Sequence, residues 1–263
     1  MLEQIVTPLL SWYDKHARVL PWREDTAAYR VWVSEIMLQQ TRVEAVKPFF
    51  ERFIKALPDV QALSEAPEDE LLKLWEGLGY YNRVRNMQKA ARVIVSEYSG
   101  DFPADYEKLL SLPGLGHYTA GAVSSIAFGI PMPAVDGNVL RVLSRVTASY
   151  EDVLKQSVKT AMEAEVKKII PADRAGDFNQ ALIEIGAIVC VPNGKAKCEI
   201  CGAEYGEPLG HDYVVIKVVE PDYRNEGYSV FECTRCKDSY IGNRVPVKPI
   251  PDVEEIAVEK TTY

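Results

Sequence analysis

Two carboxylates in this chain of 263 residues have local sequences that could make them reactive groups. Glu35 lies within VWVSEIMLQQ, with apolar residues on both sides of it. A carboxyl group in apolar surroundings resists ionisation, which suits a proton donor near neutral pH. Asp136 precedes a helical run in PMPAVDGNVLRVLSR, where a helix N-terminus would keep it ionised. Each has a simpler interpretation, because a glutamate is ordinary on a helix surface and an aspartate is a common N-cap.

The segment LPGLGHYTAG (112–121) could hold a phosphate between two helices. Gly114 and Gly116 permit the positive φ angles of a tight reversal, and the next helix begins at once. Free N–H groups at such a helix N-terminus bind an anion without a basic side chain. An ordinary turn between packed helices is the competing interpretation. The surrounding Leu-Pro and Tyr-Thr-Ala-Gly favour a helix-hairpin-helix DNA-binding motif.

The composition is that of an ordinary globular protein, with 47% hydrophobic and 26% charged residues and a net charge of −8. Bulk charge therefore offers phosphates little attraction, so nucleic-acid binding must depend on local features such as the hairpin. No apolar run reaches the roughly 18 residues of a membrane span. Residues 1–15 predict an amphipathic helix rather than a signal peptide. We expect a cytoplasmic protein with no membrane partner.

Hydrophobic periodicity predicts two kinds of structure along the chain. Apolar residues recur at spacings of three and four through residues 1–190, which predicts about ten helices in an all-α bundle. The expected helix boundaries are Pro21, Pro48, Pro58, Gly77, Gly79, Pro103, Pro113, Pro131, Pro133 and Pro171. The β-type runs 214–219 and 228–233 flank a polar turn and predict a hairpin. Residues 241–263 are proline-rich at their start and are expected to be a linker.

All five cysteines lie after residue 189, at Cys190, Cys198, Cys201, Cys233 and Cys236. A disulfide framework would spread them along the chain, whereas this clustering is typical of metal ligation. Two Cys-x2-Cys pairs around a predicted β-hairpin match a zinc ribbon, whose ligands would be the last four cysteines. His211 lies between the pairs, where a loop residue is the simpler interpretation.

Several segments together resemble the helix-hairpin-helix superfamily of base-excision glycosylases, and within it the adenine DNA glycosylase (MutY-type) branch. They follow the family order over most of residues 1–200. The matching segments are LPWR (20–23), VWVSEIMLQQTRVE (31–44), WEGLGYYNRVRN (75–86), LPGLGHYTAGAV (112–123), VDGNVLRVLSR (135–145) and FNQALIEIGAIVC (178–190). The string SEIMLQQT is highly specific, while the hairpin alone would not be.

The resemblance implies a catalytic role for four residues. Glu35 matches the acid that protonates adenine N7, and Asp136 matches the carboxylate that stabilises the sugar cation. Asn138 matches a residue that orients water and this carboxylate. Tyr118 stands where related lyases carry a lysine that forms a Schiff base with the sugar, and tyrosine cannot form an imine. The resemblance therefore implies a monofunctional glycosylase, with a packed aromatic as the simpler role for Tyr118.

The resemblance also implies contacts with double-stranded DNA and with an extruded adenine. Gln40 and Tyr80 match residues that enter the base stack. Trp22, Arg23 and Gln180 match residues that line the adenine pocket, and the amide of Gln180 could pair with an adenine edge. The hairpin residues expected at the phosphates are Gly114, Leu115, Gly116, His117 and Thr119.

The cysteines depart from the family pattern of a [4Fe-4S] cluster on Cys-x6-Cys-x2-Cys-x5-Cys. Here seven residues separate the first two cysteines, and Glu207 stands where the fourth ligand belongs. The sequence after Cys236 resembles the segment that comes after the fourth family ligand. The resemblance thus implies a cluster on Cys190, Cys198, Cys201 and Cys236, while the zinc ribbon would replace Cys190 with Cys233. Either centre would be structural.

The implied architecture is a monomer of two helical lobes with the DNA cleft between them. A six-helix barrel at 29–127 would carry the hairpin, and 1–28 with 128–200 would form the second lobe. A metal segment with the β-hairpin would occupy 198–240. Residues 241–263 would be a linker or the start of a missing domain that family members use to recognise 8-oxoguanine.

The implied function is excision of adenine mispaired with 8-oxoguanine or guanine, by base flipping and acid-assisted hydrolysis. Two alternatives stay open. A thymine–guanine mismatch glycosylase also combines this hairpin with a tyrosine. A noncatalytic DNA-binding module would use the hairpin and a zinc ribbon.

Overall fold

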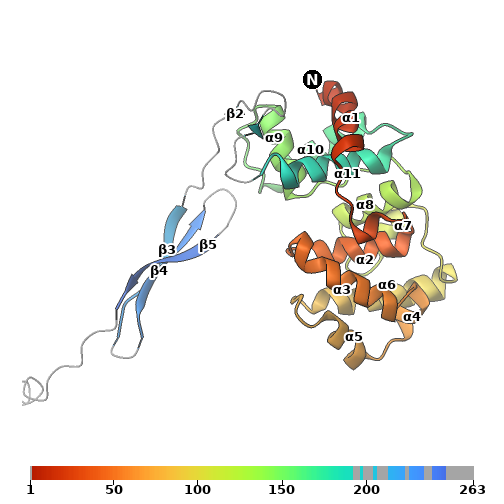
Figure 1. Cartoon of the computed structure of the whole chain (residues 1–263), viewed down its shortest axis with the longest axis horizontal. Coiled ribbons are helices and arrows are strands. Elements are labelled where there is room, and N and C mark those ends of the chain that lie inside the picture. The colour runs from red at the N-terminus through yellow and green to blue at the C-terminus, as the bar shows by residue number, and fades with distance from the viewer. Residues whose placement is uncertain are drawn as a thin grey trace, which may run out of the picture. The chain divides into compact units, whose positions relative to one another are not determined.

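The computed structural model describes residues 2–191, 196–197, 204–205, 213–222, 225–233 and 239–246. The chain divides into two compact units, Met1–Glu204 and Tyr205–Tyr263, and each is considered by itself. The first unit is helical and the second is a small antiparallel sheet (Figure 1). The chain is mostly helical, as expected, and the C-terminal unit contains the expected β-hairpin together with a third strand.

In the helical unit, helices follow one another along residues 2–188. Its elements are η1 (Leu2–Ile5), α1 (Val6–His16), η2 (Pro21–Arg23), α2 (Ala28–Leu38), α3 (Val43–Ala56), α4 (Val60–Glu65), α5 (Glu68–Trp75), α6 (Asn82–Tyr98), α7 (Tyr106–Ser111), α8 (His117–Phe128), α9 (Gly137–Val146), α10 (Gln156–Ile169) and α11 (Ala175–Ile188). The short strands β1 (Ala196–Lys197) and β2 (Glu204–Tyr205) pair with each other.

Aspartate side chains fix several helix starts. Asp59, Asp105 and Asp136 precede α4, α7 and α9, and each accepts a hydrogen bond from an N–H in the first turn at 2.8–3.0 Å. These bonds satisfy donors that have no acceptor within the helix. At the other end of α8, Gly129 adopts the left-handed conformation that closes a helix (φ 65°).

Pro48 was expected to mark a helix boundary, but it lies inside α3 rather than at its end. Proline in a helix interior removes a hydrogen bond and crowds the preceding turn. The stripe of Val46, Phe50 and Phe53 along α3 is buried to 1% exposure or less. Burial of this stripe holds the helix together across the proline, since apolar burial along a helix outweighs one lost backbone bond.

The helical unit contains two hydrophobic clusters, which are formed by different helices. One cluster draws on α2 to α8 and is rich in aromatic rings, among them Trp32, Phe50 and Trp75. The other joins α1, α9, α10 and α11, which lie together in the upper group of Figure 1. Helix α8 contacts both α2 and α11, and small buried residues fill its middle turns. It therefore connects the elements on which the functional residues are expected.

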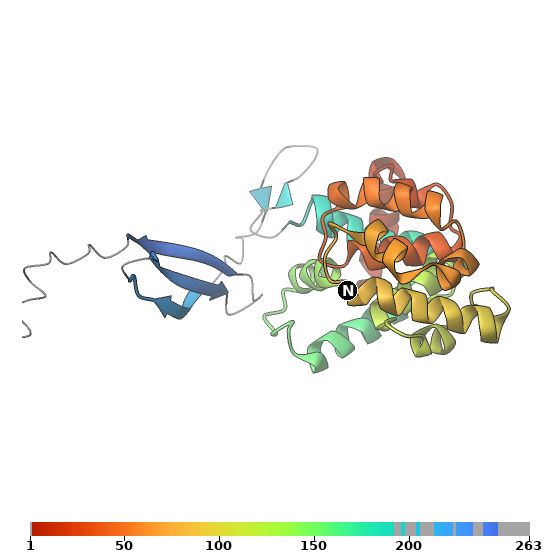
Figure 2. The ribbon, with the colours of Figure 1, turned by 90° about the horizontal axis from the view of Figure 1, so that it is seen from below.

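Leu20 and Trp22 precede α2 in the chain and pack in the cluster of α2 to α8. Figure 2 shows the helical unit from below, where α4 and α5 pack against the yellow α6. No helix among the described residues is long and apolar enough to cross a membrane.

The C-terminal unit is a three-stranded antiparallel sheet in the order β3 (Tyr213–Val219), β4 (Gly227–Cys233) and β5 (Ser239–Val245). The predicted hairpin is present as β3 and β4, with Val219 opposite Tyr228. The sequence did not predict the third strand. Residues 241–245 were expected to be part of a linker, but they belong to β5. Gly242 and Asn243 interrupt the strand-forming residues of β5, and pairing with β4 decides its structure.

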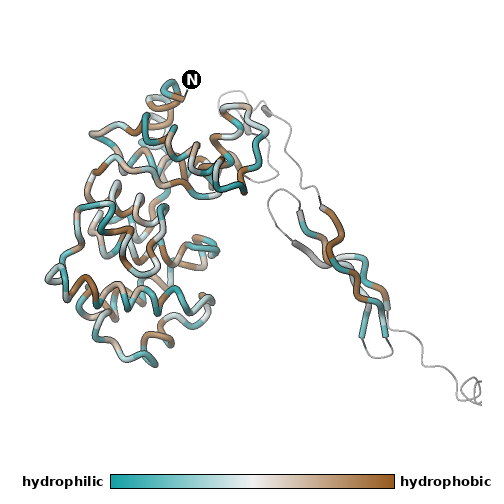
Figure 3. The backbone as a smooth tube through the Cα atoms, turned by 180° about the vertical axis from the view of Figure 1, so that it is seen from behind, coloured by the Kyte–Doolittle hydropathy of each residue, from teal (hydrophilic) through white to brown (hydrophobic). Residues whose placement is uncertain are grey.

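β3 is an edge strand whose apolar side chains are largely exposed within the unit. Val214, Val215, Ile216 and Val218 are each 44–60% exposed, and β3 is brown in the hydropathy view of Figure 3. A sheet this small cannot bury both faces of a strand, because only three strands contribute side chains.

Candidate active site

Glu35 lies on the buried face of α2 and is only 8% exposed. Its Oε2 accepts a hydrogen bond from Tyr118 Oη at 2.6 Å. Tyr118 is the second residue of α8, so the contact joins two helices that pack along each other. Glu35 is therefore buried, as its apolar sequence neighbours suggested.

Burial is the largest influence on Glu35 and raises the pKa of its carboxyl to about 7. The hydrogen bond from Tyr118 lowers this pKa in part, the charge of Asp136 raises it, and Arg23 lowers it. A group with a pKa near 7 is protonated in a large fraction of molecules at neutral pH. It can therefore deliver a proton under ordinary conditions.

Asp136 combines the two roles that the sequence left open. Its Oδ1 accepts from the backbone N–H of Val139 at 2.8 Å, which caps α9. Its Oδ2 accepts from Asn138 Nδ2 at 2.8 Å, and both residues line a cavity with Glu35.

This cavity, of about 490 Å³, collects side chains from segments far apart in the sequence. Its size is in the range of small-molecule sites, roughly 300–1,000 Å³. The sequence-predicted residues that line it are Trp22, Arg23, Glu35, Gln40, Tyr118, Asp136, Asn138 and Gln180. Trp22 is fixed there by an edge contact with Phe50, at 5.5 Å between ring centroids.

Asn179 holds the segment that leads into Asp136. Its Nδ2 donates to Ser125 Oγ and to the Met132 carbonyl, and its Oδ1 accepts from the Ala134 N–H. A Cβ on Gly121 would lie 1.9 Å from the Pro133 carbonyl oxygen, so only glycine lets α8 approach this segment. The chain segment that leads into Asp136 is therefore held between α8 and α11.

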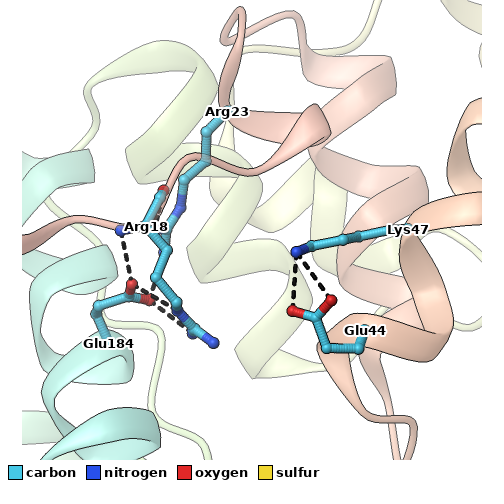
Figure 4. Close-up of polar contacts among 5 residues, drawn as sticks. All are labelled: Arg18, Arg23, Glu44, Lys47 and Glu184. Atoms are coloured by element: carbon cyan, nitrogen blue, oxygen red, sulfur yellow. Dashed lines mark hydrogen bonds and ion pairs between the residues drawn. The ribbon is translucent and has the colours of Figure 1, made fainter.

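A second buried glutamate lines the same cavity in a different electrostatic environment (Figure 4). Glu184 on α11 is fully buried and accepts from Arg18 at 2.7 and 2.8 Å and from Arg23 at 3.0 Å. Burial alone would raise its pKa, but the two guanidinium groups outweigh burial and lower the pKa to about 2. Glu184 is therefore a fixed anion, and it orients both arginines.

Gln40 and Tyr80 share an unusual backbone conformation. Both are left-handed, with φ of 58° and 49°, although neither is glycine. Gln40 lines the cavity, and Tyr80 is 65% exposed outside it. Non-glycine residues adopt this conformation rarely, and such residues cluster at functional sites.

The hairpin has the predicted turn, with Gly114 at φ 79° and α8 beginning at His117. Ala120 is the first residue of α8 whose N–H reaches a backbone acceptor, so the N–H groups before it are free of helical bonds. The side chains of Leu115 and Thr119 are buried. A contact from either of them to a phosphate would therefore come from the backbone.

The residues 33–171 match the family model described as "HhH-GPD superfamily base excision DNA repair protein". The chain belongs to this HhH-GPD superfamily. The resemblance that the motifs implied is confirmed at this level.

Curated relatives of the chain are adenine DNA glycosylases. The protein from Buchnera aphidicola subsp. Schizaphis graminum is 39% identical, and the match covers 73% of this chain and 56% of the relative. The Homo sapiens protein is 45% identical, with 74% of this chain and 37% of the relative covered. The chain thus spans about half the length of the first relative and less of the second.

Solved structures share the fold. A thermostable thymine-DNA glycosylase gives a TM-score of 0.66 at 29% identity, over 76% of this chain and 92% of its own. An endonuclease III–DNA complex gives 0.62 at 25% identity, over 72% and 86%. The mostly helical HhH-GPD glycosylase fold is therefore established for this chain.

Cys190 is the one cysteine of this HhH-GPD chain whose side chain the structure describes. It is buried, and its Sγ accepts from Arg145 Nη1 at 3.0 Å. Arg141 joins the Cys190 carbonyl (2.7 Å) to Asn138 Oδ1 (2.8 Å). Among described residues, no three potential ligands form a metal site. Cys198, Cys201, Cys236 and His211 lie outside them, as does the Cys233 side chain.

Sequence reasoning missed Arg18, Asn179 and Glu184 in this HhH-GPD site. Glu184 follows Gln180 by four residues and so lies on the same face of α11, a signal that could have identified it. Nothing in the sequence distinguished Asn179 from its neighbours, because its partners come from residues 125–134.

Proposed function

We propose that this chain is a monofunctional DNA glycosylase that excises adenine mispaired with 8-oxoguanine or guanine. The observation that carries the proposal is a buried glutamate with a pKa of about 7, in one cavity with a helix-capping aspartate. Hydrolysis of an N-glycosidic bond needs a neutral acid for the leaving base and a carboxylate for the cationic sugar. The names of the curated relatives support adenine as the base.

In the proposed reaction, Glu35 donates its proton to N7 of an extruded adenine. The C1′–N9 bond then breaks, and its electron pair leaves with the protonated base. Asp136 stabilises the positive charge that develops on the sugar, and Asn138 holds Asp136 through its 2.8 Å hydrogen bond. Water attacks the sugar cation and loses a proton, which leaves an abasic site and free adenine.

Tyr118 supports the assignment to hydrolysis without strand cleavage. Its hydroxyl donates to Glu35 and cannot form an imine with the sugar. The hydrogen bond lowers the pKa of Glu35 in part, so Tyr118 tunes the acid and holds its carboxyl in place. We infer that the chain leaves the DNA strand intact.

The cavity offers groups for recognition of the base. Trp22, Arg23 and Gln180 are proposed to line the adenine pocket, with the Gln180 amide at a base edge. Arg23 is oriented by Glu184, whose fixed charge keeps the guanidinium from moving. Partly buried polar groups of this kind discriminate between bases because a wrong base leaves them unpaired.

Double-stranded DNA is the proposed partner, bound by a single copy of the chain. The free N–H groups at the start of α8, with Gly114, Gly116 and His117 around them, would receive a phosphate. Gln40 and Tyr80 would fill the space in the base stack.

For the cysteines we propose a structural [4Fe-4S] cluster held by Cys190, Cys198, Cys201 and Cys236. The hydrogen bond from Arg145 to Cys190 Sγ fits this assignment, because a cationic donor stabilises a thiolate ligand. When bound, such a cluster would cross-link the chain after α11. Zinc on Cys198, Cys201, Cys233 and Cys236 is the alternative, and an absorption spectrum with elemental analysis distinguishes the two.

The test is base release under single-turnover conditions from duplexes with adenine opposite 8-oxoguanine, adenine opposite guanine, and thymine opposite guanine. The wild type should release adenine from the first two. Glu35→Gln should bind these duplexes but release adenine about 10²- to 10⁴-fold more slowly. Glu44→Gln is the matched control, because Glu44 is exposed and paired with Lys47.

Other outcomes point to the other candidates. The similarity to a thymine-DNA glycosylase makes thymine excision the second candidate, and thymine release from the third duplex alone would establish it. Binding without release of any base by the wild type would indicate a noncatalytic module. Normal turnover by Glu35→Gln would refute the assignment of the acid.

A further inference from the structure

Arg83 binds two separate backbone segments at once. It lies in the first turn of α6, and its two terminal nitrogens donate only to main-chain carbonyls. Nη1 reaches one segment and Nη2 the other. The acceptors are the carbonyls of Ile36 (2.8 Å), Met37 (3.3 Å), Gln39 (2.5 Å), Leu78 (3.0 Å) and Gly79 (3.3 Å).

The position of these carbonyls explains why the contact matters. The Gln39 carbonyl belongs to the peptide that joins it to Gln40, and the Gly79 carbonyl belongs to the peptide that joins it to Tyr80. The orientation of each peptide sets the φ angle of the next residue. Gln40 and Tyr80 are the left-handed pair at the site, with φ of 58° and 49°. Arg83 therefore holds both strained conformations directly.

Aromatic contacts reinforce this clamp. The guanidinium lies 5.4 Å from the Trp75 ring centroid and 5.5 Å from that of Tyr80. Trp75 is fully buried, and its Nε1 donates to the same Gly79 carbonyl at 3.0 Å. The charge of Arg83 is directed at rings and carbonyls, and no ion pair with a carboxylate involves it among the described residues. A planar fork can make these contacts, whereas a lysine cannot span both segments.

We propose that Arg83 is a positioning residue that sets Gln40 and Tyr80 together for insertion into the DNA base stack. This inference rests on the proposed function, because it assumes that the two side chains enter DNA. Arg83 itself touches neither the base nor the sugar. Its role is to fix the segment that holds Gln40 relative to the segment that holds Tyr80, so that the two side chains enter the base stack together.

The experiment uses the full chain and a duplex with 2-aminopurine opposite guanine, whose fluorescence rises when the base leaves the stack. Arg83→Lys should keep a thermal midpoint near that of the wild type and bind duplex within about twofold. Its fluorescence gain should be lost, and adenine release should fall roughly 10²-fold, the effect of a small misplacement. Arg52→Ala is the matched control, because Arg52 also binds a carbonyl (Leu74, 2.9 Å) and covers a ring (Phe49, 4.8 Å).

A double-mutant comparison tests whether Arg83 acts through the two residues. In the Gln40→Ala/Tyr80→Ala background, Arg83→Lys should cause little further loss. An undiminished fluorescence gain in Arg83→Lys, an equal defect in Arg52→Ala, or a full further loss in that background would each overturn the inference. If Arg83→Lys unfolds, Trp75→Phe removes one donor to the Gly79 carbonyl and should reduce the gain severalfold; an unchanged gain would likewise overturn it.

The same assay separates this inference from the proposed function. Base extrusion precedes bond cleavage, so the fluorescence comparison applies even to a wild type that releases no adenine. Failure of release in the wild type would sink the proposed function alone. Normal release and normal extrusion in Arg83→Lys would sink the inference alone.

Discussion

Each of the two walls of the cavity carries a buried glutamate, and the pKa values of the two glutamates are shifted in opposite directions. On the wall formed by α2 and α8, Glu35 has a tyrosine as its partner and a pKa of about 7. On the wall formed by α11 and the segment after α1, Glu184 has two arginines and a pKa of about 2. Burial raises the pKa of both, so the partner decides the outcome. At neutral pH Glu35 is protonated in a large fraction of molecules, whereas Glu184 is ionised.

The largest expected effect comes from removing the charge of Glu184. Glu184→Gln leaves Arg18 and Arg23 without their anion, and breaking a buried pair in this way should cost about 3–5 kcal/mol. Unfolding by urea at pH 7 measures this loss. Glu44→Gln, at an exposed ion pair, should change stability by less than about 0.5 kcal/mol. A loss no larger than that of the control would show that Glu184 is not held as an anion.

The pH dependence of stability sharpens the same point. The folded pKa of Glu184 is below its usual value of 4.5, so its contribution is present above pH 4.5. It is lost as the pH falls toward about 2. The difference between wild type and Glu184→Gln should therefore shrink in acid.

The next largest effect is an increase in stability, and it comes from replacing Glu35, on the other wall, with glutamine. The folded pKa of Glu35 is raised, so the fold loses stability as the pH rises from 4.5 to about 7. Glu35→Gln removes this loss and should be more stable than wild type by about 2–3 kcal/mol at pH 8, with little difference at pH 4. Urea unfolding at the two pH values checks this. Equal stabilities at pH 8 would place the Glu35 pKa near its ordinary value.

The smallest effect concerns how Tyr118 tunes the acid. Its hydrogen bond lowers the pKa of Glu35, so Tyr118→Phe should raise that pKa further. The alkaline limb of the pH profile for adenine release should move upward by roughly half a unit to one unit, since one hydrogen bond is worth about 1 kcal/mol. Single-turnover rates between pH 5 and 9 measure the limb. A limb that moves downward would mean that Tyr118 favours the protonated acid.

Much of the local structure could be predicted from the sequence. The helical unit, the hairpin strands β3 and β4, and the cap at Asp136 all follow from patterns within about ten residues. Pro48 and β5 could not be predicted, because each depends on a neighbour in space. Pro48 is tolerated where α3 buries its apolar stripe, and β5 forms where β4 offers an edge.

The candidate site shows the same division. The motifs identified the eight expected residues that line the cavity, and their catalytic and binding roles remain proposals. Leu115 and Thr119 were expected at the phosphates, and the burial of their side chains leaves the backbone to make such contacts. Arg83 was part of a matching segment, yet its clamp on two loops is visible only in the fold.

The sequence by itself determined the helices, the tight hairpin and the residue types that meet at the cavity, because these depend on neighbours along the chain. Only the tertiary structure decided which carboxyl keeps a proton. Glu35 acquires its partner 83 residues away, and Glu184 acquires Arg18 from 166 residues away. Proton affinity depends on the charges and solvent within a few ångströms, and the packing of α2, α8 and α11 sets both.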